Sequence, residues 1–277
     1  MIGATMTSKK LAGPVIAGID GSDAARDAAV WAADEATARG VPLRLIYATK
    51  RTHDSTDDYT ADVQRARTSL QEARAAVEAT GRPVTIETAI VDGPPATALI
   101  DLSAHAGMVC VGSVGIGRYA RSVLGSVATD VAEKARCPVA VIRPRTEDVG
   151  RDITWIIVAV DDSPGNDAVV DQAMREATLR HAPVLALGER DSGREPGPEL
   201  DETIRKYRQR YPDVHVYAIN DHADVVHFLR KHDERVLLAV IGSTDAADVA
   251  QIIGGSHLSK GHPIFHRAHS SALIVRG

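Results

Sequence analysis

Few cysteines, no long apolar run and no excess of basic charge narrow the classes of protein that this sequence can encode. Two cysteines in 277 residues, Cys110 and Cys137, are too few for a disulfide framework, and we expect both to be buried and unbonded. No stretch of about 18 apolar residues could span a bilayer, and the start lacks the apolar run of a signal peptide. A net charge of −5 leaves no basic footprint for nucleic acid. We therefore expect a cytoplasmic protein with no membrane span and no nucleic-acid partner.

The sequence does contain a regular alternation of apolar strands and helices. With 44% hydrophobic and 25% charged residues, the chain can bury sizeable cores, and its length suits two domains. Uninterrupted apolar strands between helices are typical of a parallel sheet that is covered on both faces, so the predicted class is doubly wound α/β. In the first half, strands are predicted at 14–19, 43–48, 84–91, 107–111 and 138–142, and helices at 23–39, 61–80, 95–106 and 126–136.

The second half repeats the first. Residues 17–43 align with residues 158–184 at an offset of 141, which places Asp161 opposite Asp20. The residues at 111–113 then match those at 241–243 at a shorter offset of 130, and a charged linker separates the two copies. The sequence therefore predicts two tandem α/β domains, at residues 1–145 and 152–277.

A glycine-rich loop follows the fourth predicted strand. It contains Gly112, Gly115, Gly117 and Gly125, and Ser126 then opens the last helix of the first domain. Such a loop presents backbone N–H groups and the positive end of a helix dipole, which together bind phosphate. The side chains of Arg118 and Arg121 would add positive charge.

Asp20 is predicted to lie at the same edge of the sheet, because it directly follows the first strand. Ligands of doubly wound sheets bind at the carboxyl ends of the strands, where the strand order reverses. A carboxylate cannot usefully face bare phosphate, so Asp20 would hold ribose hydroxyls or a Mg²⁺ ion that bridges the phosphates.

Other interpretations of the glycine loop are weaker. A P-loop would need Lys at Arg118 and Ser or Thr at Tyr119. The stretch 115–120 matches a dinucleotide-binding fingerprint, but it follows the fourth strand rather than the first. A flexible loop without a ligand is the remaining alternative.

The spacing Gly112-x₂-Gly115-x₉-Gly125-Ser126 resembles the ATP-binding signature of the universal stress proteins. The stretches VIAGIDGS, VDGPPATALIDLSAHAGMVCVGS and ARCPVAVIR extend this resemblance, which covers both halves of the chain. It implies two adenine nucleotide alpha hydrolase-like domains, each with a five-stranded parallel sheet, and ATP whose adenine reaches backbone near Ala48 and Val91. The implied ATP-binding residues are Gly18, Asp20, Ala48, Val91, Gly112, Ser113, Val114, Gly115, Gly117, Arg118, Gly125, Ser126 and Val127, with Mg²⁺ at Asp20.

The resemblance also implies a role in the stress response. Such proteins mostly sense or store nucleotide and signal through a partner protein, which the sequence does not name, with at most slow hydrolysis. The absence of a nucleophile–base pair from the sequence agrees with a protein that is not an enzyme. A homodimer is expected. Two alternatives remain open: an interaction or scaffold protein that needs no nucleotide, and a nucleotide-using transferase of the same sheet superfamily.

The second half departs from the ATP-binding signature. Its spacing contains Gly242, Gly255 and Ser256, but Asp245 replaces the second glycine. We expect a degenerate site that is kept for structure, so that each chain holds one ATP in the first domain, and a metal site that uses Asp245 is the alternative. His262, His266 and His269 could share one helical face and bind a metal or sense acid, although a solvated face is favoured.

Overall fold

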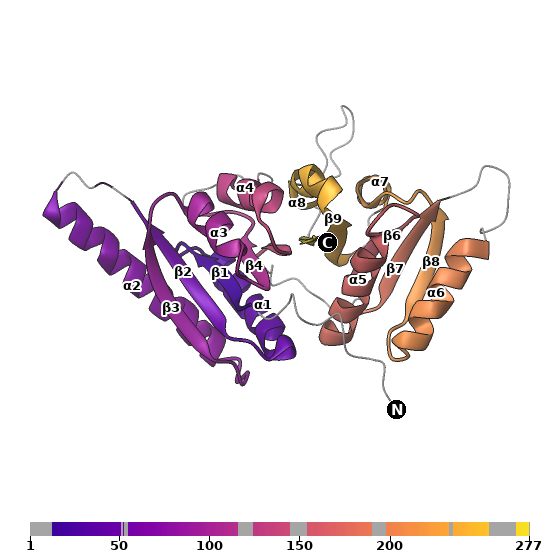
Figure 1. The fold of residues 1–277 in the computed structure, drawn as a ribbon, viewed down its shortest axis with the longest axis horizontal. Helices are drawn as coiled ribbons and strands as arrows, with labels where there is room; N and C mark the ends of the chain where they lie inside the picture. Colours follow the sequence, from indigo (N-terminus) through magenta and orange to yellow (C-terminus); the bar gives the residue numbers. More distant parts are fainter. Residues whose placement is uncertain are drawn as a thin grey trace. The chain divides into compact units, whose positions relative to one another are not determined.

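The computed structural model describes residues 13–50, 52, 55–115, 124–144, 154–189, 198–232, 235–254 and 270–276. The chain divides into two compact units, which the colours of Figure 1 distinguish as indigo to magenta and red to yellow. The first unit contains residues 13–115 and 125–144, and the second contains the described residues from 154 to 276. The predicted domain boundaries at residues 145 and 152 lie outside the described residues and stay predictions.

The first unit is a doubly wound sheet of five parallel strands in the order β3-β2-β1-β4-β5. The chain builds outward from β1 to β3 and then returns to place β4 and β5 on the other side of β1. The strand order therefore reverses between β1 and β4, which is where such sheets bind ligands. The elements are β1 (Val15–Ile19), α1 (Asp23–Arg39), β2 (Leu43–Thr49), α2 (Thr56–Glu78), β3 (Ile86–Asp92), α3 (Pro95–Ser103), β4 (Met108–Gly112), α4 (Ser126–Lys134) and β5 (Val139–Ile142).

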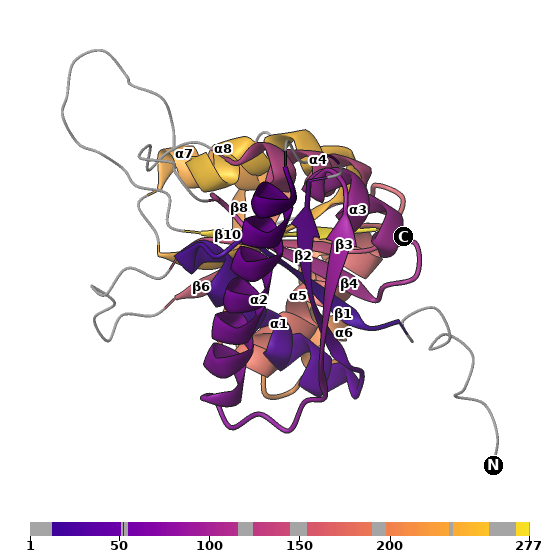
Figure 2. The ribbon, with the colours of Figure 1, turned by 90° about the vertical axis from the view of Figure 1, so that its left-hand side faces the viewer.

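Helices cover both faces of this sheet. Helix α1 packs against α2, and α3 packs against α4. Right-handed crossovers place the first pair on one face and the second pair on the other. Figure 2 shows α2 running alongside β2 and β3. Strands β4 and β5 are buried along almost their whole length, as the uninterrupted apolar runs predicted.

Two residues that can be recognised in the sequence, one at each end, cap helix α1. Ser22 accepts a hydrogen bond from the Ala25 N–H at 3.2 Å, and Gly40 ends the helix with a φ of 64°. The predicted range 23–39 is confirmed. The predicted start of α2 at residue 61 is wrong, because Ser55 accepts a hydrogen bond from the Asp58 N–H at 3.1 Å and begins the helix five residues earlier.

The second unit repeats the strand order of the first. Its parallel sheet runs β10-β9-β6-β7-β8, so β6 corresponds to β1 and β9 to β4. This confirms the predicted fold class for both halves. The elements are β6 (Trp155–Val160), α5 (Asn166–Arg180), β7 (Val184–Glu189), α6 (Pro198–Arg210), β8 (Val216–Asp221), α7 (Val225–Lys231), β9 (Val236–Gly242), the 3₁₀-helix η1 (Ser243–Asp248), α8 (Val249–Gly254) and β10 (Ser271–Val275).

The repeat extends to a buried ion pair on the first helix of each unit. Arg39 Nη2 lies 3.0 Å from Glu35 Oε2, and the two side chains are 15% and 3% exposed. Arg180 Nε lies 3.0 Å from Glu176 Oε2, with side chains that are 9% and 1% exposed. Because the pairs have i, i+4 spacing, each one is positioned by its own helix.

Two expectations from composition can be compared with the described residues. Cys110 and Cys137 form no disulfide and are both buried, as predicted. None of the helices among these residues combines the length and the apolar character that crossing a membrane requires.

Candidate functional site

The carboxylate of Asp20 is held at the carboxyl end of β1. Its Oδ1 accepts a hydrogen bond from the Ser22 N–H at 2.9 Å, which forms an Asx turn at the entrance to α1. Gly21 permits this turn with a φ of 87°. The turn places the side chain at the point where the strand order reverses, as the sequence predicted.

Gly115 lies directly against this carboxylate. A Cβ atom added to Gly115 would lie 2.6 Å from Asp20 Oδ2, which is closer than van der Waals contact allows. The Ser22 hydroxyl also donates a long hydrogen bond of 3.5 Å to the Val114 carbonyl oxygen. The loop after β4 and the turn after β1, which are far apart in the sequence, therefore form one surface.

Two of the other glycines are explained by packing rather than by a ligand. A Cβ on Gly112 would lie 2.7 Å from the backbone of Ala24, because β4 ends against the start of α1. A Cβ on Gly18 would lie 2.8 Å from Leu99 Cδ1 of helix α3. Gly112 and Gly18 lie at the predicted edge of the sheet. Glycine is needed at these two positions because a side chain would collide with the helix that packs there.

Hydrogen bonds within the unit already occupy some of the predicted phosphate donors. The Ser113 N–H donates to the Ile142 carbonyl oxygen at 2.8 Å, and the Gly125 N–H donates to the Ser113 carbonyl oxygen at 2.8 Å. The side chain of Ser113 is buried. These bonds tether both ends of the loop to the sheet, so Ser113 and Gly125 shape the loop rather than offer their N–H groups to a ligand.

The first turn of α4 supplies the backbone N–H groups that remain available to a phosphate. Gly125 is the N-cap of this helix. Because glycine has no side chain, the N-cap residue offers no side-chain acceptor to the N–H groups of Ser126 and Val127. No acidic residue lies in this first turn. Among the described residues, neither a capping side chain nor an acidic residue of the first turn occupies the positive end of this helix dipole, which suits an anion. Gly117 and Arg118, together with Arg121, lie outside the described residues.

The ends of β2 and β3 form the side of the site that was predicted for adenine. Ala48 pairs with Val91 in the parallel register, at the carboxyl end of both strands. Thr49 then donates to Asp92 Oδ1 at 2.9 Å and ties the two strand ends together. Ala48 and Val91 are therefore neighbours across β2 and β3, and the contact of either residue with adenine stays a prediction.

A polar group beside β2 was missed from the sequence. Asp62 of α2 accepts a hydrogen bond from the Lys50 N–H at 3.2 Å and pairs with Arg65 at 3.2 Å. Burial raises the pKa of the Tyr47 phenol, and the carboxylates of Asp62 and Asp20 raise it further. Asp62 and Arg65 both lie inside the predicted helix 61–80, but their i, i+3 spacing could not show that Asp62 reaches the backbone of Lys50.

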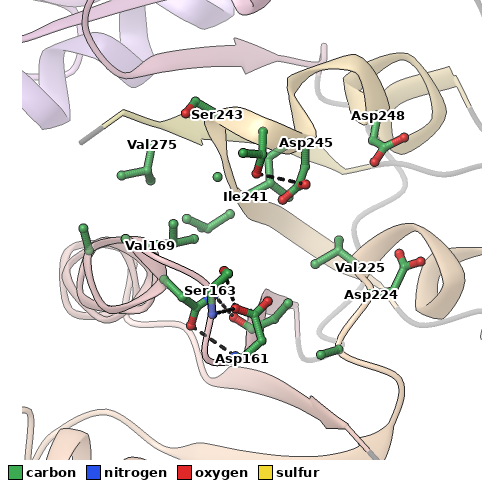
Figure 3. Close-up of a pocket in the computed structure, with 18 of the residues that line it drawn as sticks. Asp161, Ser163, Val169, Asp224, Val225, Ile241, Ser243, Asp245, Asp248 and Val275 are labelled. Carbon is green, nitrogen blue, oxygen red and sulfur yellow. Dashed lines mark hydrogen bonds between the residues drawn. The ribbon is translucent and has the colours of Figure 1, made fainter.

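The second unit keeps the turn after its first strand. The Ser163 N–H donates to Asp161 Oδ1 at 2.8 Å, and the Ser163 hydroxyl donates to the same oxygen. Figure 3 shows this turn at one side of a pocket of about 550 Å³. The pocket lies at the carboxyl ends of β6 and β9, so it corresponds in position to the site of the first unit.

The segment after β9 differs from a phosphate loop. Residues Ser243–Asp248 form a 3₁₀-helix and Val249–Gly254 form α8, so this stretch is helical before Gly255 is reached. Asp245 lines the pocket together with Asp224 and Asp248. The other two residues of the predicted degenerate signature, Gly255 and Ser256, lie outside the described residues, as do His262, His266 and His269.

The carboxylates of this pocket influence one another. Burial raises the pKa of the Asp248 carboxyl, and the charges of Asp245 and Asp224 raise it further. Among the described residues, no group of three or more His, Cys, Asp or Glu side chains is arranged to hold one metal ion. The alternative that Asp245 is a metal ligand therefore gains no support here.

Comparisons with known proteins agree with this architecture. The model of the universal stress protein family matches residues 13–143. A universal stress protein of Mycobacterium tuberculosis strain H37Rv is 52% identical over 95% of this chain and 96% of its own length. A second one from the same strain is 35% identical over 94% of this chain and 95% of its own.

The fold also matches a solved structure over both units. The crystal structure of a universal stress protein from Archaeoglobus fulgidus DSM 4304 has a TM-score of 0.66 and covers 96% of this chain and 98% of its own. At 14% identity this likeness concerns the fold alone. Because a relative more than half identical spans nearly the whole chain, the protein belongs to the universal stress protein family.

Proposed function

We propose that the first unit binds ATP at the carboxyl edge of its sheet and uses the bound nucleotide as a signal. One observation carries the proposal: the open first turn of α4 and the carboxylate of Asp20 lie on the same edge, and Gly115 lies against that carboxylate. An anion-binding helix end beside a fixed carboxylate suits a ligand that combines phosphates with hydroxyl groups.

Each part of the nucleotide has a partner in this proposal. The phosphates would accept hydrogen bonds from the N–H groups of Ser126 and Val127, and adenine would lie at the ends of β2 and β3, near Ala48 and Val91. Asp20 would accept hydrogen bonds from the ribose hydroxyls. A Mg²⁺ ion that bridges the phosphates also fits Asp20, because a carboxylate oxygen is a ligand that Mg²⁺ prefers, and the ion would neutralise phosphate charge.

The proposed role is a stress response in which the ATP-bound chain engages a signalling protein. Hydrolysis of the bound nucleotide is proposed to be slow at most. The cytoplasmic location and the homodimer expected from the sequence belong to the same proposal.

The test compares two equivalent aspartates. ATP is titrated calorimetrically into the wild-type chain, Asp20→Ala and Asp161→Ala, and any small molecule that copurifies is identified by mass spectrometry. Removal of the ribose acceptor should weaken ATP binding about tenfold in Asp20→Ala. Asp161→Ala, which changes the corresponding turn of the second unit, should leave the affinity unchanged.

Two outcomes would favour the other candidate functions. If ATP binding to the wild-type chain is too weak to detect, the result would favour a scaffold protein that needs no nucleotide. Release of AMP or pyrophosphate on incubation with ATP would indicate a transferase.

A further inference from the structure

The outer edge of β3 carries backbone groups that have no hydrogen-bond partner among the described residues. β3 ends the strand order of the first unit and pairs with β2 along its other edge. The Leu43 N–H donates to the Thr85 carbonyl oxygen, so every second residue of β3, counted from Thr85, turns its backbone groups toward β2. The N–H and C=O groups of Ile86, Thr88 and Ile90 therefore point away from the sheet. Figure 2 faces this side of the first unit.

This edge also lacks the features that keep most sheet edges from pairing. Proteins commonly protect an edge with proline, lysine, a β-bulge or a covering element. β3 contains neither proline nor lysine, and its register with β2 runs without a bulge along all 7 residues. Ile90 is 37% exposed, although it is a large apolar residue. We therefore expect another strand to cover this edge.

The corresponding edge of the second unit is partly protected by its own helix. The Val184 N–H donates to the His215 carbonyl oxygen, which turns the backbone groups of Val216 and Ala218 outward from β8. Arg208 Nη2 of α6 donates to the outward carbonyl oxygen of Val216 at 2.6 Å. Among the described residues, α2 makes no comparable bond to β3. The two outer edges therefore differ, and a partner strand is expected only on β3.

The outward residues of β3 read the same in both directions, because Thr88 stands between Ile86 and Ile90. Their side chains lie on one face of the sheet, since residues two apart point to the same side. An antiparallel copy, related by a two-fold axis at Thr88, would place Ile86 opposite Ile90 of the partner subunit. The outward N–H and C=O groups of all three residues would then be paired. Such self-complementarity is what a two-fold interface between identical chains requires.

The charges on β3 do not oppose this pairing. In the same register, Glu87 lies opposite Ala89 of the partner subunit, so no like charges are directly opposed. Arg44 Nε of β2 lies 3.2 Å from Glu87 Oε2 and compensates the charge at the middle of the strand. A neutral edge that is complementary to itself suits a second copy of the chain better than a charged peptide.

We propose that the outer edge of β3 is the interface of a homodimer, in which β3 pairs antiparallel with β3 of a second copy about a two-fold axis at Thr88. The inference rests on the homodimer of the proposed function and names the surface that forms it. The pairing leaves the hydrogen bonds inside the first unit unchanged. It does not depend on whether this unit binds ATP.

A cysteine cross-link tests the position of the axis. In a hydrogen-bonded antiparallel pair the two Cα atoms lie about 5.5 Å apart, which suits a disulfide. Thr88→Cys in the full chain should therefore form a covalent dimer when the thiol oxidant diamide is added, as seen by non-reducing electrophoresis. Cys110 and Cys137 are buried, so the wild-type chain should form no cross-link. Ala218→Cys, on the outward edge of β8, is the matched control and should also form none.

A proline at the same position tests the strand pairing itself. The Thr88 N–H points outward, so Thr88→Pro removes a donor from the proposed interface and none from the ladder between β2 and β3. Sedimentation equilibrium should show a dimer dissociation constant at least about tenfold above that of the wild-type chain. Ala218→Pro makes the same change on β8 and should stay within about twofold.

A second variant is available if Thr88→Pro does not fold, as judged by circular dichroism. Ile90→Lys places an ammonium group in the proposed pair of isoleucines, at a position that is exposed in the single chain. It should also raise the dimer dissociation constant at least about tenfold, because the charge would lose water in the interface.

Two results would overturn the proposal in different ways. A dimer that keeps its affinity in Thr88→Pro, and forms no cross-link in Thr88→Cys, would preserve the homodimer and place its contact elsewhere. A wild-type chain that stays a monomer at micromolar concentration would remove the homodimer as well and would leave the edge to a strand of another protein. Neither result bears on ATP binding, which calorimetry measures separately.

Discussion

The two units share a fold, a strand order and an aspartate turn, yet the surfaces beside those turns differ in charge. In the first unit, Gly115 lies against Asp20 and the next helix opens with a first turn free of acidic residues. In the second unit, Asp245 and Asp248 lie on a 3₁₀-helix that lines the pocket. The comparison teaches that the two sheets place equivalent aspartate turns at the same edge, whereas the segment after the fourth strand decides the charge of the surface beside each turn.

The largest expected effect comes from giving the first unit the charge of the second. Gly115→Asp would place a carboxylate beside the proposed phosphates, and a separation of about 4 Å costs about 4 kcal/mol at an effective dielectric constant near 20. The affinity for ATP should fall about a thousandfold by calorimetry. Ala75→Asp, at an exposed position of α2, adds the same charge and should leave binding unchanged. An unaltered affinity in Gly115→Asp would show that the phosphates lie elsewhere.

The reverse substitution sharpens the same comparison. From the sequence alone, Asp245→Gly would be expected to restore a second ATP site. The structure adds Asp224 and Asp248 to the same pocket and makes residues 243–254 helical. We therefore expect Asp245→Gly to bind one ATP per chain, as the wild-type chain should. A rise to two bound nucleotides, counted after gel filtration, would show that Asp245 alone excludes ATP.

The buried ion pairs should have similar effects in the two units. Arg39→Met leaves the buried carboxylate of Glu35 without its arginine, and Arg180→Met does the same to Glu176. Removal of one partner of a buried pair destabilises a protein by about 3 kcal/mol or more. Hydrogen exchange measured by mass spectrometry should show the loss of protection in the affected unit only. A loss below about 1 kcal/mol in either unit would indicate that water reaches the carboxylate.

Equivalent glycines at the ends of β4 and β9 should differ in their tolerance of a methyl group. A Cβ on Gly112 meets the backbone of Ala24 at 2.7 Å, whereas the nearest atom to a Cβ on Gly242 is Thr244 Oγ1 at 3.5 Å. Gly112→Ala should cost about 2 kcal/mol of unfolding free energy. Gly242→Ala should change it by no more than about 0.5 kcal/mol. Urea denaturation of the two variants measures the difference, and equal effects would contradict the packing described for α1.

The smallest expected difference concerns the serines of the two aspartate turns. Ser22 caps α1 through the Ala25 N–H, so Ser22→Ala should cost about 1 kcal/mol. Ser163 donates to Asp161 instead, and the N-cap of α5 is Gly165, which makes no side-chain cap hydrogen bond. Ser163→Ala should therefore cost less than Ser22→Ala in the same denaturation experiment. The order would be reversed if the Asp161 turn, rather than the cap, stabilised the helix start.

The sequence predicted the features that depend on neighbouring residues along the chain, and it did not predict those that depend on contacts between distant segments. Ser22 and Gly40 mark the ends of α1 in the sequence, and the strands followed from their apolar runs. The roles of Gly18 and Gly112 were not predictable, because their close neighbours come from α3 and α1. Spacing alone also could not show that residues 243–254 are helical, or that Asp62 of α2 reaches the backbone of Lys50.

The position of β5 has a consequence for the synthesis of the chain. It is both the last strand of the first unit in the sequence and the outermost strand in the order of that unit. Every strand of the first sheet has therefore left the ribosome once residue 142 has emerged. Since domains generally fold as units during synthesis, with the N-terminal one first, the first unit can reach its native structure while the second is still being translated.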